Sequence, residues 1–256
     1  MLAGRTVLVL HAHPDDEAIF TGATIHRLAR AGARVVLVTA TGGELGVPLT
    51  PLPRGLTVGE VRRAELEAAA ERLGVARLVD LGYRDSGMPG WPGAGHLKAL
   101  DRADFDLLAH RVAHLAESEG ASALLHYDSN GIYGHPDHIA VHEIGRRAAV
   151  LASITGYEAT VDHEHLHFTA RHLVEGDRPR VGRPSGVGLP TVEITTAVAA
   201  EPVDLEAKLD AMELHASQIA PIDRSGDIEG PYGLEWYVRR GAPGVLEALG
   251  NAHAVA

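Results

Sequence analysis

The 256-residue sequence contains no cysteine. Disulfide bonds, cysteine-ligated zinc, iron–sulfur clusters and a thiol nucleophile are therefore excluded, and any bound metal must use His, Asp or Glu. Long apolar runs are also missing, since the one near the N-terminus, Thr6–Leu10, is too short to span a membrane and stops at His11. Because no signal-peptide pattern follows, we expect a soluble cytoplasmic protein without membrane insertion.

Positive charge is scarce as well, with 23 Lys and Arg against 34 Asp and Glu, which gives a net charge of −11. Such a chain lacks the broad basic surface of general nucleic-acid or anionic-membrane binders, so nucleic acid is not an expected partner. Hydrophobic residues at 45% and charged residues at 22% are close to the globular average, which excludes a disordered or coiled-coil chain. Histidine, present 16 times, is the one unusual count.

Short β-branched and aliphatic segments alternate with amphipathic segments over the first 150 or so residues. Strands are expected at 6–10, 34–39, 77–81 and 123–127, and helices at 18–31, 58–73, 105–119 and 138–149. This alternation is typical of a parallel sheet, so we predict an α/β fold with a Rossmann-like parallel sheet flanked by helices. Beyond Gly156 the alternation weakens. With one strand expected at 192–197 and one helix at 205–217, that region is interpreted as a smaller C-terminal lobe.

Two polar loops follow predicted strands, and both contain the tripeptide His-Pro-Asp. The first loop, 11–17, reads H-A-H-P-D-D-E, and the second, 133–138, reads Y-G-H-P-D-H. Ligands of open α/β sheets bind just beyond the carboxyl ends of the strands, so both loops should meet at one edge. The first loop has no G-x-G-x-x-G, which disfavours a nicotinamide or flavin enzyme.

The facing loops supply the material of a catalytic zinc site, which uses two histidines and one carboxylate and leaves a position for water. A further carboxylate and imidazole remain after the ligands are assigned. These groups could act as general base and general acid beside a metal-bound water, so the motifs predict hydrolysis.

The segments His13–Glu17 and His135–His138 resemble the PIG-L/LmbE-like zinc-dependent N-acetylglucosaminyl deacetylases, which remove N-acetyl groups from glucosamine-containing substrates. The resemblance continues through Arg62–Glu65 and Leu81–Met88 and covers roughly the first 150 residues. A helix ending in His-x-x-Gln, here His215–Gln218, is a softer match. The family resemblance as a whole implies a metal-binding catalytic domain over residues 1–156, with the lobe over 157–256 completing the substrate pocket.

The resemblance implies a Zn²⁺ ion held by His13, Asp16 and His138, a site that Fe²⁺ could also occupy. It assigns Asp15 as the general base that deprotonates the bound water. It assigns His135 as the general acid, which a neighbouring carboxylate should help to keep protonated.

The resemblance also implies roles for residues around the substrate. Tyr133 is expected to polarise the amide carbonyl and stabilise the oxyanion, with a packing role under the lid as its alternative. Arg62 and Asp85 are expected to bind sugar hydroxyls, although for Arg62 a helix-surface ion pair with Glu65 is an open alternative. The implied substrate is a small-molecule amino sugar, and a homo-oligomer is possible.

Three other functions stay open at this point. One is an amidase that acts on a bulkier thiol-sugar or natural-product conjugate, which would differ in the region after Gly156. Another is a non-catalytic carbohydrate-binding protein that retains the fold, against which intact Asp15 and His135 argue. The third is a non-haem iron oxygenase with a facial triad, disfavoured because the surrounding pattern is α/β.

Several further residues carry weaker expectations. Glu17 should occupy the first turn of a helix and complement its dipole. His142 is expected to be exposed or packed in the core, and His11 to lie at a strand end under the site. Asp162 should cap a helix that scatters the nearby histidines into a surface patch, namely His163, His165 and His167. A basic run is expected to lie in a surface loop or to contact an anionic substrate: Arg178, Arg180 and Arg183.

Overall fold

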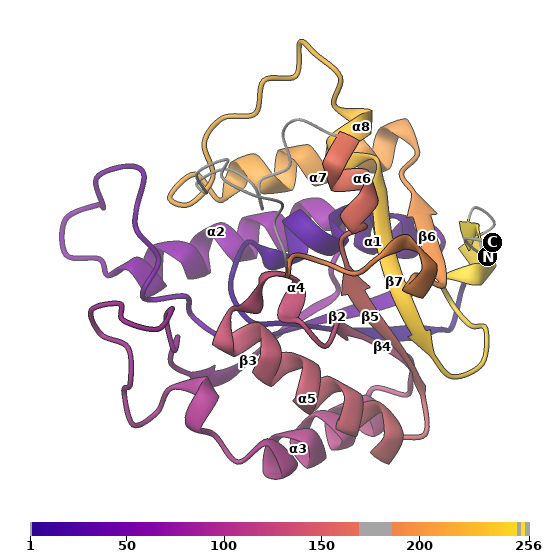
Figure 1. Cartoon of the computed structure of the whole chain (residues 1–256), viewed down its shortest axis with the longest axis horizontal. Helices are drawn as coiled ribbons and strands as arrows, with labels where there is room; N and C mark the ends of the chain where they lie inside the picture. The colour runs from indigo at the N-terminus through magenta and orange to yellow at the C-terminus, as the bar shows by residue number, and fades with distance from the viewer. Residues whose placement is uncertain (1, 169–185, 250–251, 254–256) are drawn as a thin grey trace.

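The computed structural model describes residues 2–168, 186–249 and 252–253. These residues form an eight-stranded sheet in the order β3-β2-β1-β4-β5-β7-β6-β8 (Figure 1). Five neighbouring strands are parallel, namely β1 (Thr6–His11), β2 (Arg34–Thr41), β3 (Arg77–Tyr83), β4 (Ala121–Tyr127) and β5 (Thr155–Thr160). Antiparallel pairing adds β7 (Leu234–Arg240), β6 (Thr196–Ala199) and β8 (Ala252–His253).

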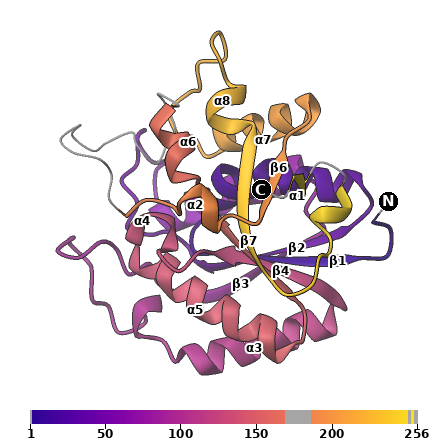
Figure 2. The same cartoon turned by 45° about the vertical axis from the view of Figure 1, so that its right-hand side comes forward.

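Helices cover both faces of the sheet (Figures 1 and 2). One face carries α1 (Asp16–Arg30), α2 (Val58–Leu73) and α7 (Pro202–Leu214). The opposite face carries α3 (Phe105–Ser118) and α5 (Pro136–Leu151). Shorter helical segments join these elements: α4 (Gly131–Gly134), α6 (His163–Phe168), α8 (Glu229–Tyr232), and the 3₁₀ turns Leu100–Arg102, Thr191–Glu193 and Glu247–Leu249.

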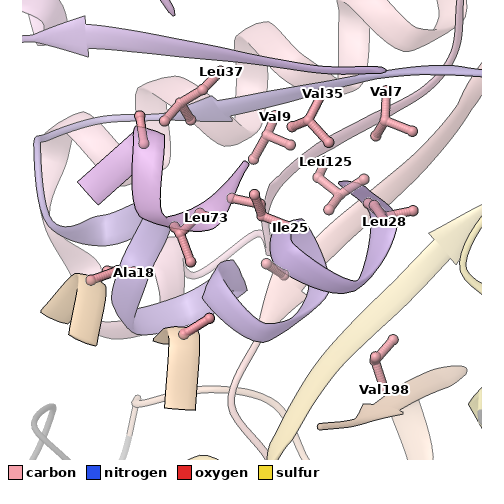
Figure 3. Close-up of a cluster of buried hydrophobic side chains, with 14 of the residues drawn as sticks. Val7, Val9, Ala18, Ile25, Leu28, Val35, Leu37, Leu73, Leu125 and Val198 are labelled. Atoms are coloured by element: carbon pink, nitrogen blue, oxygen red, sulfur yellow. The ribbon is translucent and has the colours of Figure 1, made fainter. Parts of the chain in front are cut away.

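The central strand β1 shows why the sheet is buried on both sides. Val7 and Val9 join the cluster under α1, where Figure 3 shows Val9 on the side of Ile25 and Val7 on the side of Leu28, while Leu8 and Leu10 join the cluster under α3 and α5. Every residue of β1 is buried. Since burying one such aliphatic side chain is worth about 1.5–3 kcal/mol, the uninterrupted apolar run stabilises both layers at once.

The predicted Rossmann-like α/β fold is confirmed, and the predicted strands and helices of the first 150 residues are all present as β1–β4, α1, α2, α3 and α5. Sequence reasoning missed β5 and β7. It was wrong about a strand at 192–197, where a 3₁₀ turn comes first and β6 starts only at Thr196. The strands β6 and β7 depend on each other for hydrogen bonds, so local sequence alone signals them poorly.

Residues beyond 157 continue the same sheet through β7, β6 and β8 and add α7 to the face that holds α1 and α2. The domain boundary near residue 156 stays a prediction. Among the residues that the structure describes, no helix is both long enough and apolar enough to cross a bilayer.

Candidate metal centre

The two His-Pro-Asp loops meet because β1 and β4 are parallel neighbours. The loop after β1 carries His13 and leads into α1, whose first residue is Asp16. The loop after β4 leads into α5, which begins at Pro136 rather than at His138 as expected. Proline is favoured at the first position of a helix, and here it places His138 in the first turn, facing the other loop.

Three donor atoms converge at this edge. His13 Nδ1 lies 3.3 Å from Asp16 Oδ2 and 3.3 Å from His138 Nε2, and Asp16 Oδ2 lies 3.4 Å from His138 Nε2. All three side chains are buried. A tetrahedral zinc with nitrogen and oxygen ligands at about 2.0–2.1 Å spaces those ligands about 3.3–3.4 Å apart, so the donor set fits such an ion.

Carboxylate and imidazole charges balance each other within this group. Burial alone would raise the pKa of Asp16, but the imidazoles of His138 and His13 lower it well below its ordinary value. Burial lowers the pKa of His13, whereas hydrogen bonds to carboxylates, first that of Asp137, raise it well above its ordinary value. The site therefore keeps Asp16 ionised, as a metal ligand must be.

Asp137 orients His13 from behind. Its Oδ2 lies 3.0 Å from His13 Nε2 and accepts the backbone N–H of Ser86, while its Oδ1 accepts the Ser86 hydroxyl. A carboxylate on one ring nitrogen fixes the tautomer and directs the other nitrogen to a metal. No role was predicted for Asp137, although its place in the second His-Pro-Asp motif was the available signal.

A second group of donors, formed by His13, Asp85, His135 and Asp137, also lies within 4.8 Å of one another. It shares His13 with the first group but uses its other nitrogen. Both oxygens of Asp137 already accept hydrogen bonds from Ser86, so this group is suited to supporting the first one.

Tyr127, the last residue of β4, forms the floor under His138. The two rings stack at 4.3 Å between centroids and 13° between planes. The Tyr127 hydroxyl accepts the backbone N–H of Ala12 at 3.0 Å and lies 2.8 Å from His11 Nδ1. His11 is therefore a buried strand-end residue under the site, as expected. Sequence reasoning gave no hint of Tyr127, because its role arises only from strand pairing.

Asp15 lies beside the donor group in an unusual backbone conformation, with φ 111°. Its Oδ2 lies 3.0 Å from Arg62 Nη2. Burial raises the pKa of the Asp15 carboxyl to about 6, and the Arg62 guanidinium acts in the opposite direction. A non-glycine residue at positive φ costs of order 1–3 kcal/mol and is often found at functional sites.

His135 is the N-cap of α5 and accepts the backbone N–H of Asp137 on Nδ1 at 3.1 Å. Its proton is therefore on Nε2, which lies 4.0 Å from Asp85 Oδ1. The expectation that a carboxylate keeps His135 protonated is wrong in this structure. Burial, followed by the charges of His13 and His138, lowers its pKa to about 3 despite the opposing effect of the carboxylates.

Tyr133 points at the same group, with its hydroxyl 3.3 Å from His138 Nε2. Burial raises its pKa well above the ordinary value, so the hydroxyl keeps its proton. The preceding residue, Ile132, has φ 61°, and its carbonyl accepts the N–H of Gly188. A β-branched residue rarely adopts this conformation, so the chain is strained where it directs Tyr133 inward.

Arg62 and Asp85 both line the site but are engaged differently than expected. Arg62 is 4% exposed and donates to the carbonyls of Gly43 and Pro14 as well as facing Asp15. The alternative of a surface pair between Arg62 and Glu65 is wrong. Asp85 accepts backbone N–H groups of the neighbouring loops. Contact of either side chain with a sugar stays a prediction.

These side chains open into one cavity of about 870 Å³. The loop expected over 82–95 forms part of its wall, and so does the loop after β2. The other lining residues add an apolar rim and one amide: Ile19, Phe20, Leu49, Met88, Pro89, Trp91, Ala220 and Gln218. The cavity thus combines polar side chains with an apolar lining, which is common in small-molecule sites.

Among the residues that the structure describes, the other histidines take no part in this donor group. His142 is buried in the core with Nδ1 2.9 Å from the carbonyl of Tyr127, as expected. Asp162 caps α6 by accepting the backbone N–H groups of Glu164 and His165, which confirms the predicted cap. His163 and His165 are half-buried, and each has a ring nitrogen within hydrogen-bond distance of a backbone carbonyl, so these two do not form a fully solvated patch. The other expectations lie outside the described residues or side chains: those for His167, Arg178, Arg180 and Arg183.

Comparison with known proteins gives consistent results. The family model for PIG-L, GlcNAc-PI de-N-acetylase, matches residues 8–149. The chain is 38% identical over 250 residues to a 1D-myo-inositol 2-acetamido-2-deoxy-alpha-D-glucopyranoside deacetylase of Kineococcus radiotolerans, with 84% of this chain and 69% of the relative covered. A protein of the same name from Thermobifida fusca is 36% identical, with 84% of each chain covered.

Solved structures share the fold. An N,N'-diacetylchitobiose deacetylase from Pyrococcus horikoshii matches 84% of this chain and 71% of its own, with a TM-score of 0.55 and 22% identity. The zinc-inhibited form of a teicoplanin deacetylase matches 92% of this chain and 98% of its own, with a TM-score of 0.61 and 18% identity.

Proposed function

Because the chain belongs to the PIG-L family of GlcNAc-PI de-N-acetylases, we propose that it is a metal-dependent hydrolase that removes an N-acetyl group from an amino sugar. One observation carries the proposal. Three donor atoms lie at metal-ligand spacing, and two of their residues, His13 and Asp16, line a cavity together with a carboxylate and an imidazole that are outside the donor set. A binding protein that only retained the fold would have no use for those two additional groups.

The proposed ligands are His13, Asp16 and His138, and the proposed ion is Zn²⁺, with Fe²⁺ as an alternative that leaves the reaction unchanged. When bound, the metal acidifies a water molecule and polarises a carbonyl group. Two imidazoles and one carboxylate leave a coordination position for these tasks, which is typical of catalytic rather than structural zinc.

The chain's own groups then have separate roles. Asp15 takes the proton of the attacking water, and its pKa near 6 suits a base that works around neutral pH. Tyr133 keeps its hydroxyl proton and donates a hydrogen bond to the oxygen on which charge develops. The neutral ring of His135 carries its one proton on Nε2, so His135 acts as the proposed general acid towards the departing amine only after it has taken up a second proton, such as the one that Asp15 removes from the water. Arg62 orients Asp15 through their ion pair.

We propose a glucosaminide as the substrate, since the names of both curated relatives specify an acetamido-deoxyglucopyranoside joined to inositol. The cavity has a volume of about 870 Å³, and its lining includes Met88 and Trp91 besides the polar side chains, which favours a sugar that carries a further group. Hydrolysis of a bulkier conjugate is the second candidate, supported by the same apolar rim.

The deciding experiment measures release of free amine from a panel of N-acetylated amino sugars and their inositol and aryl glycosides. The protein is tested as zinc-loaded, after chelation, and after zinc is restored. We expect release that disappears on chelation and returns with zinc. A protein that binds one zinc tightly yet releases amine from no panel member would contradict the proposal and favour the carbohydrate-binding function.

A further inference from the structure

Glu17 and His215 form a buried pair behind the proposed base. Glu17 lies in the first turn of α1, and His215 follows the last residue of α7, 198 positions further along the chain. Glu17 Oε1 lies 2.6 Å from His215 Nε2, and both side chains are 0% exposed. Glu17 occupies the first turn of α1, as predicted, but it also makes this buried contact in addition to complementing the helix dipole.

The second oxygen of Glu17 reaches the backbone of Asp15. Glu17 Oε2 accepts the Asp15 N–H at 3.0 Å. Asp15 itself has φ 111°, a backbone conformation that residues other than glycine rarely adopt. This hydrogen bond therefore acts on the one backbone position that must be held for the Asp15 carboxylate to meet Arg62 and line the cavity.

His215 is itself firmly held. Its carbonyl accepts the N–H groups of Gln218 and Ile219, at 2.9 and 2.8 Å. The next turn is tied to α2, because Ser217 donates both its N–H and its hydroxyl to Glu65. Burial lowers the pKa of His215, but the charge and hydrogen bond of Glu17 outweigh it and raise the pKa above its ordinary value.

We propose that Glu17 and His215 are a positioning pair, which holds the backbone of Asp15 in its left-handed conformation and so aims the carboxylate into the cavity. The inference rests on the proposed function only in taking Asp15 as the base. It gives the C-terminal segment a direct part in the reaction, since α7 ends at the residue that completes the pair.

A second buried pair, which joins α7 to β7 and contacts α1, provides a matched control. Glu235 Oε1 lies 2.7 Å from Lys208 Nζ of α7, and its carboxylate accepts the N–H groups of Ala23 and Thr24 within α1. Glu235 therefore resembles Glu17 in burial, in its cation from α7 and in its contacts with α1 backbone. Neither Glu235 nor Lys208 lines the cavity.

The experiment compares Glu17→Gln, His215→Gln and Glu235→Gln in the zinc-loaded protein, each in the wild-type and in the Asp15→Asn background, well below the unfolding temperature. We expect Glu17→Gln to lower kcat about 10- to 100-fold with little change in KM and unchanged zinc content. A His215→Leu variant is measured as well. His215→Gln can still donate a hydrogen bond to Glu17, so its kcat should fall less than that of His215→Leu. Glu235→Gln should change kcat by no more than about twofold.

In the Asp15→Asn background, Glu17→Gln should have no further effect on residual turnover, because a group that acts only through Asp15 has nothing left to position. Equal losses of kcat in the two backgrounds, a loss that follows zinc content, or equal losses in Glu17→Gln and Glu235→Gln would each overturn the positioning role.

A crystal structure of Glu17→Gln separates this inference from the proposed function. We expect residue 15 to leave positive φ and its carboxylate to leave Arg62. An unchanged Asp15 would overturn the inference even in an active enzyme. Conversely, a wild-type protein that deacetylates nothing would overturn the proposed function, while a displaced Asp15 in the variant would still support the positioning pair.

Discussion

Asp15 and His13 lie two residues apart in one loop, yet substitution should separate their roles. Asp15→Asn keeps the size of the side chain but removes the base, so we expect kcat to fall about 10²- to 10⁴-fold while zinc stays bound. His13→Ala removes a proposed ligand, so the metal itself should be lost. Turnover and zinc content measured on both variants check this. Equal metal loss in both, or an active Asp15→Asn enzyme, would contradict the assigned roles.

Tyr133 differs from these residues because it touches the donor group without belonging to it. Tyr133→Phe removes one hydroxyl and retains the ring, so the apolar packing beside His138 persists. We expect kcat to fall about 10²- to 10³-fold, the usual cost of removing one oxyanion donor, at unchanged zinc content. Steady-state kinetics with metal analysis measures this. A kcat like that of the wild type would assign Tyr133 to packing only.

Single residues also show the limit of motif reading. Asp137 and Glu17 both belong to the two polar motifs. The motifs alone do not indicate that Asp137 contacts the His13 ring or that Glu17 accepts the backbone N–H of Asp15. Likewise, Arg62 was expected at sugar hydroxyls, and its burial against Asp15 became visible only in the structure. These partners come from loops and helices far apart in sequence, so spacing within a motif cannot reveal them.

At the scale of elements, β4 contributes more than a ligand-bearing loop. Its His126 is fully buried against α5, where a Cβ at Gly145 would lie 2.5 Å from the imidazole Cγ, and its Nδ1 lies 3.0 Å from the carbonyl of Tyr127. Burial, with the charge of His142 as a smaller cause, lowers the pKa of His126 from 6.5 to about 3. The strand is therefore packed around a neutral imidazole.

This pKa predicts how stability depends on pH. In the unfolded chain His126 takes up a proton near pH 6.5, whereas the folded chain does so only near pH 3. The contribution of the neutral His126 to the free energy of unfolding is therefore fully present above pH 6.5. As the pH falls, this contribution decreases by up to about 1.4 kcal/mol per pH unit. His126→Leu should remove this part of the slope. Urea unfolding of both proteins from about pH 7 to about pH 5 measures it, and identical slopes would refute the assignment.

Local sequence signals explain why some elements were predictable. Helix α2 begins with a capping box between Thr57 and Glu60 and ends at Gly74 in the left-handed conformation, so both of its ends are encoded locally. In contrast, β7 carries Glu235 and Arg239 among its apolar residues. Its place in the sheet depends on antiparallel pairing with β5 and β6, which no local pattern encodes.

At the scale of the whole molecule, a buried ion pair joins the C-terminal region to the first helix. Lys208 of α7 and Glu235 of β7 meet within the layer that also contains α1, 2% and 1% exposed respectively at their side chains. Removing one partner leaves an uncompensated buried charge. We therefore expect Lys208→Met to lower the free energy of unfolding by about 3–5 kcal/mol, measured by chemical denaturation.

An exposed pair serves as the reference for that measurement. Arg63 and Glu67 lie 3.2 Å apart on α2, with more than half of each side chain exposed. Arg63→Gln should change stability by less than about 1 kcal/mol. Comparable effects of the two substitutions would mean that the Lys208–Glu235 pair is not what fastens α7 and β7 to α1.

The sequence by itself determined the parallel α/β core, the absence of cysteine chemistry and the two His-Pro-Asp loops that meet at one sheet edge, because apolar periodicity and strand-end motifs are local properties. Only the tertiary structure decided how the ligands and the base are held. Asp137, Tyr127, Glu17 and His215 reach the site from segments as much as 198 positions apart, and the burial that shifts the pKa values of Asp15 and His135 exists only once those segments have packed together.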